Sequence, residues 1–115
     1  MKHSRPKQKV SDFQIEFDAM KPSVHLRSGG LCEARYFAES FAPDAHEDVI
    51  DAFRAVKCGV RATNTHHRKY RSRGGSNALS NLLETCLNCH QWIHSFPELS
   101  NRLGLSLHEW ESEEI

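Results

Sequence analysis

The chain is 115 residues long, which suits a single domain with a modest core, and its 15 basic and 15 acidic residues give a formal charge of zero. No apolar run is long enough to cross a bilayer, and the basic stretch MKHSRPKQKV has no apolar region behind it. These features argue against a membrane protein and against a secretion signal. A soluble, cytoplasmic protein is expected.

The charges are segregated along the sequence although they sum to zero. Acidic residues gather at 44–51 and 109–114, away from two basic segments. A polarised surface that binds nucleic acid would explain this distribution, and charged loops that only face solvent are the alternative. The basic segments are an N-terminal arm with Lys2, Arg5, Lys7 and Lys9, and a block with Arg61, Arg68, Lys69, Arg71 and Arg73.

The first half of the chain is expected to hold a strand and a helix. Phe13, Ile15 and Phe17 alternate with polar residues, which is the period-2 pattern of a half-buried strand. The next stretch, PSVHLRSGG, fits either a short helix ended by its glycines or a second extended piece. A capping pair, Asp44 and Glu47, followed by an apolar stripe then predicts a helical insertion over 43–57.

The second half alternates strands with helices. RATNTHHR predicts a strand because threonine favours extended backbone, RSRGGSNALSN predicts a long polar loop, and LLET predicts a second short strand. A helix is expected over 87–96, broken at Pro97. PELSNRLG predicts a short helix closed by Gly104, and LSLHEW one last strand. The fold class is therefore α+β.

The four cysteines are expected to bind a metal ion. Cys86 and Cys89 form a CxxC pair that can hold one zinc ion, and Cys32 and Cys58 are the remaining cysteines that can complete a closed, structural site. Such an ion would also help to fold a domain with a small core. Two disulfides, or free buried thiols, are the alternatives.

The histidines point to a second, separate ion. His90 follows Cys89 directly, so on a helix it points about 100° away from the cysteine site, whereas His90 and His94 are four apart and share a face. A third ligand is available in the His66-His67 pair, whose side chains lie on opposite sides of a strand. Three ligands and an open position are typical of a catalytic ion, and the unused histidine is then free to act as a base.

The stretch TNTHHRKYRSRGGSNALSNLLETCLNCHQWIH resembles the core motif of HNH endonucleases, which have the ββα-metal fold. The flanks RSGGLCEAR and CGVRAT are similar to parts of the family whose cysteines complete a zinc site, and HSFPELSNRLGL is similar to a segment of many phage members. The resemblance covers most of residues 27–105. It implies a single HNH nuclease domain over 11–110 with its core motif at 60–96, a flexible arm at 1–10 and an acidic tail at 111–115.

The resemblance also implies a role for each motif residue. His67 matches the general base that activates water, and Asn81 matches the asparagine that orients this base and holds the loop. His66, His90 and His94 match ligands of a catalytic divalent ion, which would be Mg²⁺, Mn²⁺, Ni²⁺ or Zn²⁺. The insertion between Cys32 and Cys58 is a departure from the compact family pattern.

Together these features predict an endonuclease that hydrolyses DNA phosphodiester bonds with weak sequence preference. Arg68, Arg71 and Arg73 are candidates for phosphate contact, because the planar guanidinium matches phosphate oxygens. The rival hypothesis is a non-catalytic zinc module that binds DNA or a protein. A third, resting only on the likeness to phage members, is a nuclease that works beside the large terminase subunit in phage DNA packaging, in a bacterial or phage-infected cell.

Overall fold

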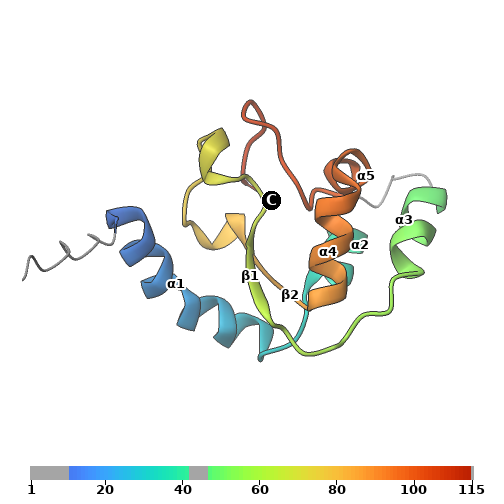
Figure 1. Ribbon diagram of the computed structural model, residues 1–115, viewed down its shortest axis with the longest axis horizontal. Helices are drawn as coiled ribbons and strands as arrows, with labels where there is room; N and C mark the ends of the chain where they lie inside the picture. The colour runs from blue at the N-terminus through green and yellow to red at the C-terminus, as the bar shows by residue number, and fades with distance from the viewer. Residues whose placement is uncertain (1–10, 42–46, 115) are drawn as a thin grey trace, which may run out of the picture.

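The computed structural model describes residues 11–41 and 47–114. A two-stranded antiparallel hairpin, β1 (Asn64–His67) and β2 (Leu82–Thr85), lies at its centre, with helices on both faces (Figure 1). α1 (Asp12–Ser28) crosses one face, and α4 (Leu87–Ser95) lies on the other. The predicted strands at residues 61–68 and 82–85, the predicted helix after Cys86 and the mixed α+β class are confirmed.

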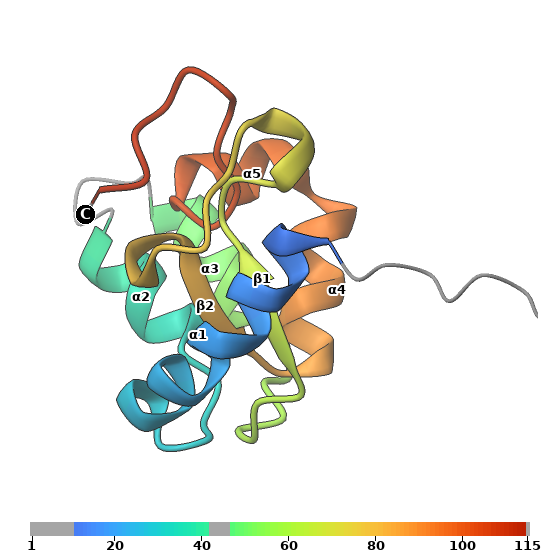
Figure 2. The same ribbon diagram turned by 90° about the vertical axis from the view of Figure 1, so that its left-hand side faces the viewer.

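The register of the hairpin decides which side chains face which helix. His66 pairs with Leu83, and both side chains are buried toward α4. His67 pairs with Leu82, and its ring lies against Phe17 of α1. Figure 2 shows α1 in front of the hairpin. The two adjacent histidines therefore lie on opposite faces, as alternation along a strand requires.

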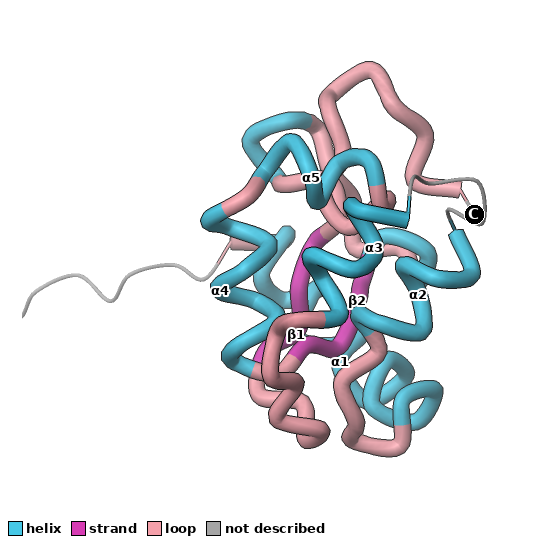
Figure 3. Tube along the Cα trace, turned by 90° about the vertical axis from the view of Figure 1, so that its right-hand side faces the viewer, coloured by secondary structure: helices cyan, strands magenta, loops and turns pink. Residues whose placement is uncertain are grey.

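The core lies between β2 and three helices, α2 (Ala34–Phe41), α3 (Glu47–Arg54) and α4, which gather on the side seen in Figure 3. Val49 and Phe53 of α3 are buried, and Phe53 packs against Trp92 with ring centroids 4.8 Å apart. This confirms the predicted apolar stripe of the insertion. Asp44 of the expected capping pair lies outside the described residues. Because the hairpin strands have only four residues each, this packing supplies stability that a lone hairpin lacks.

The segment that joins the two strands is a folded loop with two short 3₁₀ turns, η1 (Arg71–Arg73) and η2 (Leu79–Asn81). Gly75 lies where the loop folds back on itself. A Cβ at this position would lie 1.8 Å from the carbonyl oxygen of Lys69, so no larger residue fits. The sequence predicted an irregular polar loop here and missed the helical turns.

After α4 the chain turns back over the hairpin. α5 (Pro97–Arg102) begins at the expected proline, and Gly104 follows with φ +72°. The strand predicted from LSLHEW is wrong. The backbone N–H of Leu107 donates to the carbonyl of Arg68, and the carbonyl of Leu105 accepts from the His66 ring, so these polar groups are satisfied without a strand ladder.

The strand predicted at residues 13–17 is also wrong, because this segment is the start of α1. The Ser11 side chain caps the helix by accepting from the backbone N–H of Gln14. Phe13 and Phe17 are four residues apart, a spacing that puts them on one face of a helix as well as on one face of a strand. In the helix both contact His67. Ile15 is 56% exposed on another face. The ambiguous stretch that follows continues α1 to its cap at Gly29, which has φ +66°.

In the described part of the chain, no helix combines the length and the apolar character that a membrane span requires.

Candidate functional site

Four cysteines from distant segments meet at the N-terminal end of α4. Cys86 caps α4 and Cys89 lies in its first turn, while Cys32 precedes α2 and Cys58 follows α3. All four are free thiols, and their Sγ atoms lie within 4.8 Å of one another. This cysteine cluster is compact enough to surround one metal ion.

Electrostatics within the cysteine cluster favour an ion. Backbone N–H groups of Gly59 and Cys89 donate to Cys86 Sγ at 3.2 and 3.4 Å, which stabilises negative charge on sulfur. The thiol of Cys89 donates to Cys32 and thereby lowers the pKa of Cys32 to about 5, while the pKa of Cys89 is raised by the same bond and by burial. Four sulfurs this close favour a thiophilic cation, and the set fits the tetrahedral Cys₄ sites that hold zinc.

Three histidines form a second cluster beside the same helix, one turn further along. His66 comes from β1, and His90 and His94 come from one face of α4. One ring nitrogen of each lies within 4.8 Å of the others, and the Nε2 atoms of His90 and His94 are 2.9 Å apart. The rings meet nearly edge to face, at interplanar angles of 74°, 82° and 89°. This histidine cluster is the arrangement expected from the i, i+4 spacing.

Hydrogen bonds orient two of these histidines, and for His66 the bond fixes which nitrogen is offered to an ion. Leu105 O can only accept, so Nε2 of His66 donates to it at 2.7 Å and Nδ1 keeps its lone pair. The Tyr70 hydroxyl lies 3.3 Å from Nδ1 of His94, which leaves Nε2 of His94 facing His90. Such outer contacts are typical of histidines that bind metal.

Burial keeps the cluster in the form that binds metal. Burial lowers the pKa of His66 to about 4, so this imidazole is neutral near neutral pH. The pKa of His90 is also lowered, first by burial and then by the neighbouring His94. Neutral imidazoles with converging lone pairs fit a divalent cation.

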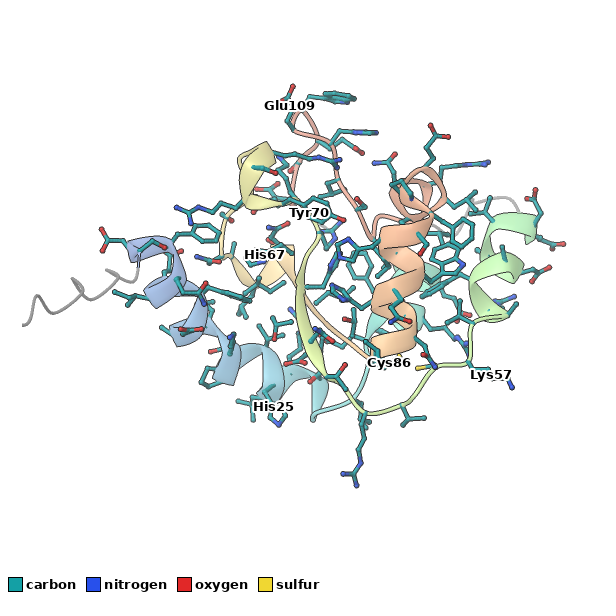
Figure 4. All side chains as sticks on the ribbon, in the orientation of Figure 1. His25, Lys57, His67, Tyr70, Cys86 and Glu109 are labelled. Carbon is teal, nitrogen blue, oxygen red and sulfur yellow. The ribbon has the colours of Figure 1, made fainter. Side chains whose placement is uncertain are left out.

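The clustered histidines open onto a shallow surface cavity of about 200 Å³. His67 lines it from the far side of β1, and Thr65, Tyr70 and Arg71 complete its wall. Figure 4 shows His67 between α1 and β1, and Tyr70 on the side toward α4. A fourth imidazole and three potential metal ligands therefore border one solvent-open space.

Three contacts hold the His67 ring. Phe13 and Phe17 of α1 lie against it, with ring centroids 5.6 and 4.5 Å away. Asn77 Nδ2 donates to the carbonyl of Phe13, so Asn77 Oδ1 is the atom that faces His67 Nε2 at 2.8 Å. That oxygen can only accept, and Nε2 of His67 therefore carries the hydrogen. Nδ1 is left as the basic nitrogen.

Asn81 performs one of the two tasks expected of it. Its side chain is buried and bonds to the loop backbone, accepting from Lys69 N and donating to Lys69 O and Ser76 O at 2.7–3.0 Å. It thus holds the loop, as predicted. The amide that contacts the His67 ring is Asn77, so the expectation that Asn81 itself orients this ring is corrected.

The three candidate arginines differ in access. Arg68 is fully buried and donates to the carbonyls of Gly104, Ser80 and Glu113, with its guanidinium 4.4 Å from the centre of the Phe37 ring. The prediction that it contacts DNA is therefore wrong, because its hydrogen bonds fasten the C-terminal segment to the hairpin loop.

The other two arginines lie near the cavity. Arg71 is exposed beside it, with its guanidinium 4.5 Å from the Phe13 ring centre, and Arg73 is half-buried and donates to Leu107 O. Of the three, Arg71 has the freest access to a ligand in the cavity.

The sequence missed three parts of the site: Asn77, Tyr70 and the carbonyl of Leu105. Asn77 and Tyr70 lie inside the recognised motif, but their partners, Phe13 and His94, come from other elements. No local pattern signals such contacts. A backbone carbonyl carries no signal in the residue identity at all.

A family model described as HNH endonuclease matches residues 54–96. The comparison with curated proteins found no match, and neither did the comparison with solved structures. The matched segment carries both strands, the connecting loop, α4, all the histidines of the cavity and three of the four clustered cysteines. The segment that builds the cavity is thus similar to HNH endonucleases, a family of metal-using nucleases that act on DNA.

Proposed function

We propose that this protein is a metal-dependent endonuclease that hydrolyses phosphodiester bonds of DNA in the cavity between β1 and α4. The observation that carries the proposal is the pairing of two arrangements across β1. On one side three imidazoles converge, and on the other a single imidazole presents a lone pair to the same cavity.

In this proposal His66, His90 and His94 hold a divalent ion, Mg²⁺, Mn²⁺, Ni²⁺ or Zn²⁺. When bound, such an ion supplies positive charge that stabilises the developing negative charge on the phosphate. Leu105 O keeps the His66 ring turned with Nδ1 inward. Three protein ligands leave positions open for substrate.

His67 acts as the general base. Its Nδ1 takes a proton from water as the water attacks phosphorus, and its Nε2–H bond to Asn77 stabilises the imidazolium that forms. Phe13 and Phe17 limit rotation of the ring and exclude water from its inner face. Arg71 contacts a phosphate oxygen beside the scissile bond.

The cysteine cluster holds a structural zinc ion that joins the segments around α2 and α3 to the start of α4. We also propose weak sequence preference, because phosphate contacts carry little sequence information. The products of plasmid cleavage distinguish the two modes: nicked circles show cutting of one strand, and linear DNA shows cutting of both. A place beside the large terminase subunit in phage packaging stays a prediction from the HSFPELSNRLGL resemblance, which copurification would support.

A plasmid-nicking assay tests the proposal. Supercoiled DNA is incubated with the zinc-loaded protein and Mg²⁺, Mn²⁺, Ni²⁺ or Zn²⁺, with and without chelator. His67→Ala is compared with the matched control His25→Ala, which removes an exposed imidazole on α1 outside this cavity. We expect His67→Ala to slow nicking at least about 100-fold, because general bases contribute about 10²–10⁴-fold. Folding and metal binding should be retained.

The control should nick like the wild type. Equal nicking by wild type and His67→Ala would overturn the assignment of the base. Absence of metal-dependent nicking by the wild type itself would favour the alternative, a non-catalytic zinc-stabilised module that binds DNA or a protein.

A further inference from the structure

Tyr70 lies directly after the segment that carries His66 and His67, and its side chain reaches across the cavity to α4. Its hydroxyl oxygen is 3.3 Å from Nδ1 of His94. The two rings stack with centroids 5.6 Å apart and planes only 16° from parallel. A hydrogen bond and a ring contact therefore act on the same imidazole.

We propose that Tyr70 is a positioning residue that fixes the tautomer and the orientation of His94, and so sets the affinity of the histidine cluster for a divalent ion. This inference rests on the proposed function, because it assigns His94 as a ligand. It adds a residue outside the ligand set.

His94 needs such support more than its neighbours do. It lies in the last turn of α4 with its side chain exposed, whereas His66 is only 2% exposed and bonds to a backbone carbonyl. An exposed histidine exchanges its hydrogen between two nitrogens and rotates about its side-chain bonds. In the proposed arrangement Nδ1 of His94 donates to the Tyr70 oxygen, so that Nε2 of His94 keeps its lone pair and faces Nε2 of His90, 2.9 Å away.

Tyr70 can serve as a support because it is itself held in place. The guanidinium of Arg73, on η1, lies 5.0 Å from the centre of the Tyr70 ring. The Tyr70 ring meets the His66 ring edge-on, with centroids 6.0 Å apart. Its backbone carbonyl accepts from the N–H groups of Arg73 and Gly75, both at 2.9 Å. The hydroxyl is therefore delivered by a folded loop, with little rotamer freedom left to lose when an ion binds.

The test uses Tyr70→Phe, which removes the hydroxyl but keeps the ring. The matched control is Tyr36→Phe, which removes the hydroxyl of the other tyrosine in the chain, 78% exposed on α2. Ni²⁺ alone, without DNA, is titrated into the zinc-loaded proteins by calorimetry. The difference in heat between the wild type and the His90→Ala variant identifies the binding that belongs to the histidine cluster.

We expect Tyr70→Phe to weaken Ni²⁺ binding about tenfold or more, in the range of about 10–100-fold seen for groups that support metal-bound histidines. Tyr36→Phe should bind within about twofold of the wild type. Equal affinity of Tyr70→Phe and wild type overturns the inference and leaves the proposed function standing. No His90-dependent Ni²⁺ binding by the wild type overturns both.

A second measurement needs no variant. Nitrogen NMR of the metal-free histidine cluster in the wild type should place the hydrogen of His94 on Nδ1, and Tyr70→Phe should shift the population toward Nε2. A change of this kind separates positioning from a merely structural effect of the ring. Hydrogen on Nε2 of His94 in the wild type would overturn the inference.

Discussion

Asn77 and Asn81 are one helical turn apart in number, yet their amides do different work. The side-chain oxygen of Asn77 accepts from the His67 ring and its nitrogen donates to α1. Both side-chain atoms of Asn81 bond to the loop backbone. Both are buried, so each lost hydrogen bond leaves a desolvated partner. The first amide acts on the proposed base, and the second acts on the fold.

Asn77→Ala is therefore expected to slow nicking about 10–100-fold, because His67 loses the group that selects its tautomer. Nicking rates at saturating DNA measure this effect. Asn81→Ala is the comparison, and we expect it to lower the free energy of unfolding by about 3 kcal/mol or more, since three backbone groups lose their partner. An Asn77→Ala protein that nicks at the wild-type rate would contradict the assigned role.

The arginines separate in the same way. Arg71→Gln should lower the slope of log affinity for DNA against log salt by about one, because one phosphate contact is lost. Binding of the His67→Ala background to a short duplex at several salt concentrations gives this slope without cleavage. Arg68→Gln should instead destabilise the fold, since Arg68 bridges three backbone carbonyls. An unchanged slope in Arg71→Gln would remove Arg71 from the interface.

His66 predicts a dependence of stability on pH. Its pKa is about 4 in the folded protein, below the usual value of 6.5, because burial disfavours the charged ring. Between these two values the unfolded chain binds the proton and the folded chain does not, so stability falls as pH falls. The loss between about pH 7 and about pH 5 should be about 2 kcal/mol.

Urea unfolding of wild type and His66→Gln at both pH values measures this loss of stability. Glutamine can still donate to Leu105 O but does not titrate. The cysteines affect the pH dependence of both proteins equally, so their contribution cancels in the difference. Parallel pH dependence in the two proteins would refute the assignment.

Among the elements, the loop between β1 and β2 depends most on a single residue. A Cβ on Gly75 would meet the carbonyl oxygens of Lys69 and Tyr70 at 1.8 and 2.8 Å, and backbone atoms cannot move aside as a side chain can. Gly75→Ala should therefore lower the free energy of unfolding by about 1–3 kcal/mol or more, as is typical of overpacking. It should also displace Tyr70 from His94. Gly59→Ala is the control, because its Cβ would meet Cys86 at an ordinary 3.5 Å. Equal urea midpoints for the two variants would contradict this account.

The elements also show what the sequence can predict. β1, β2 and α4 were predictable because their side-chain patterns are local, and the His90–His94 pair followed from helical spacing alone. The start of α1 was mistaken for a strand because Phe13 and Phe17 fit both periods. The burial of Arg68 and the link from Asn77 to His67 could not be predicted, since both depend on segments that meet only in the folded chain.

In the whole molecule, α4 connects the two clusters. Cys86 caps its start and Cys89 lies in its first turn, and His90 and His94 follow on the same helix. An ion among the cysteines would therefore fix the end of the helix on which the histidines depend. Cys86→Ser should abolish nicking as well as folding, although Cys86 lies outside the cavity.

The central claim is that sulfur and imidazole ligands hold separate ions with separate tasks. A chelator titration tests it when zinc retained per chain and nicking activity are followed in the same samples. We predict two steps: nicking is lost first, with about one zinc retained and the fold intact, and is restored by added Mn²⁺ or Ni²⁺. Loss of nicking, zinc and folded structure together in one step would contradict the account.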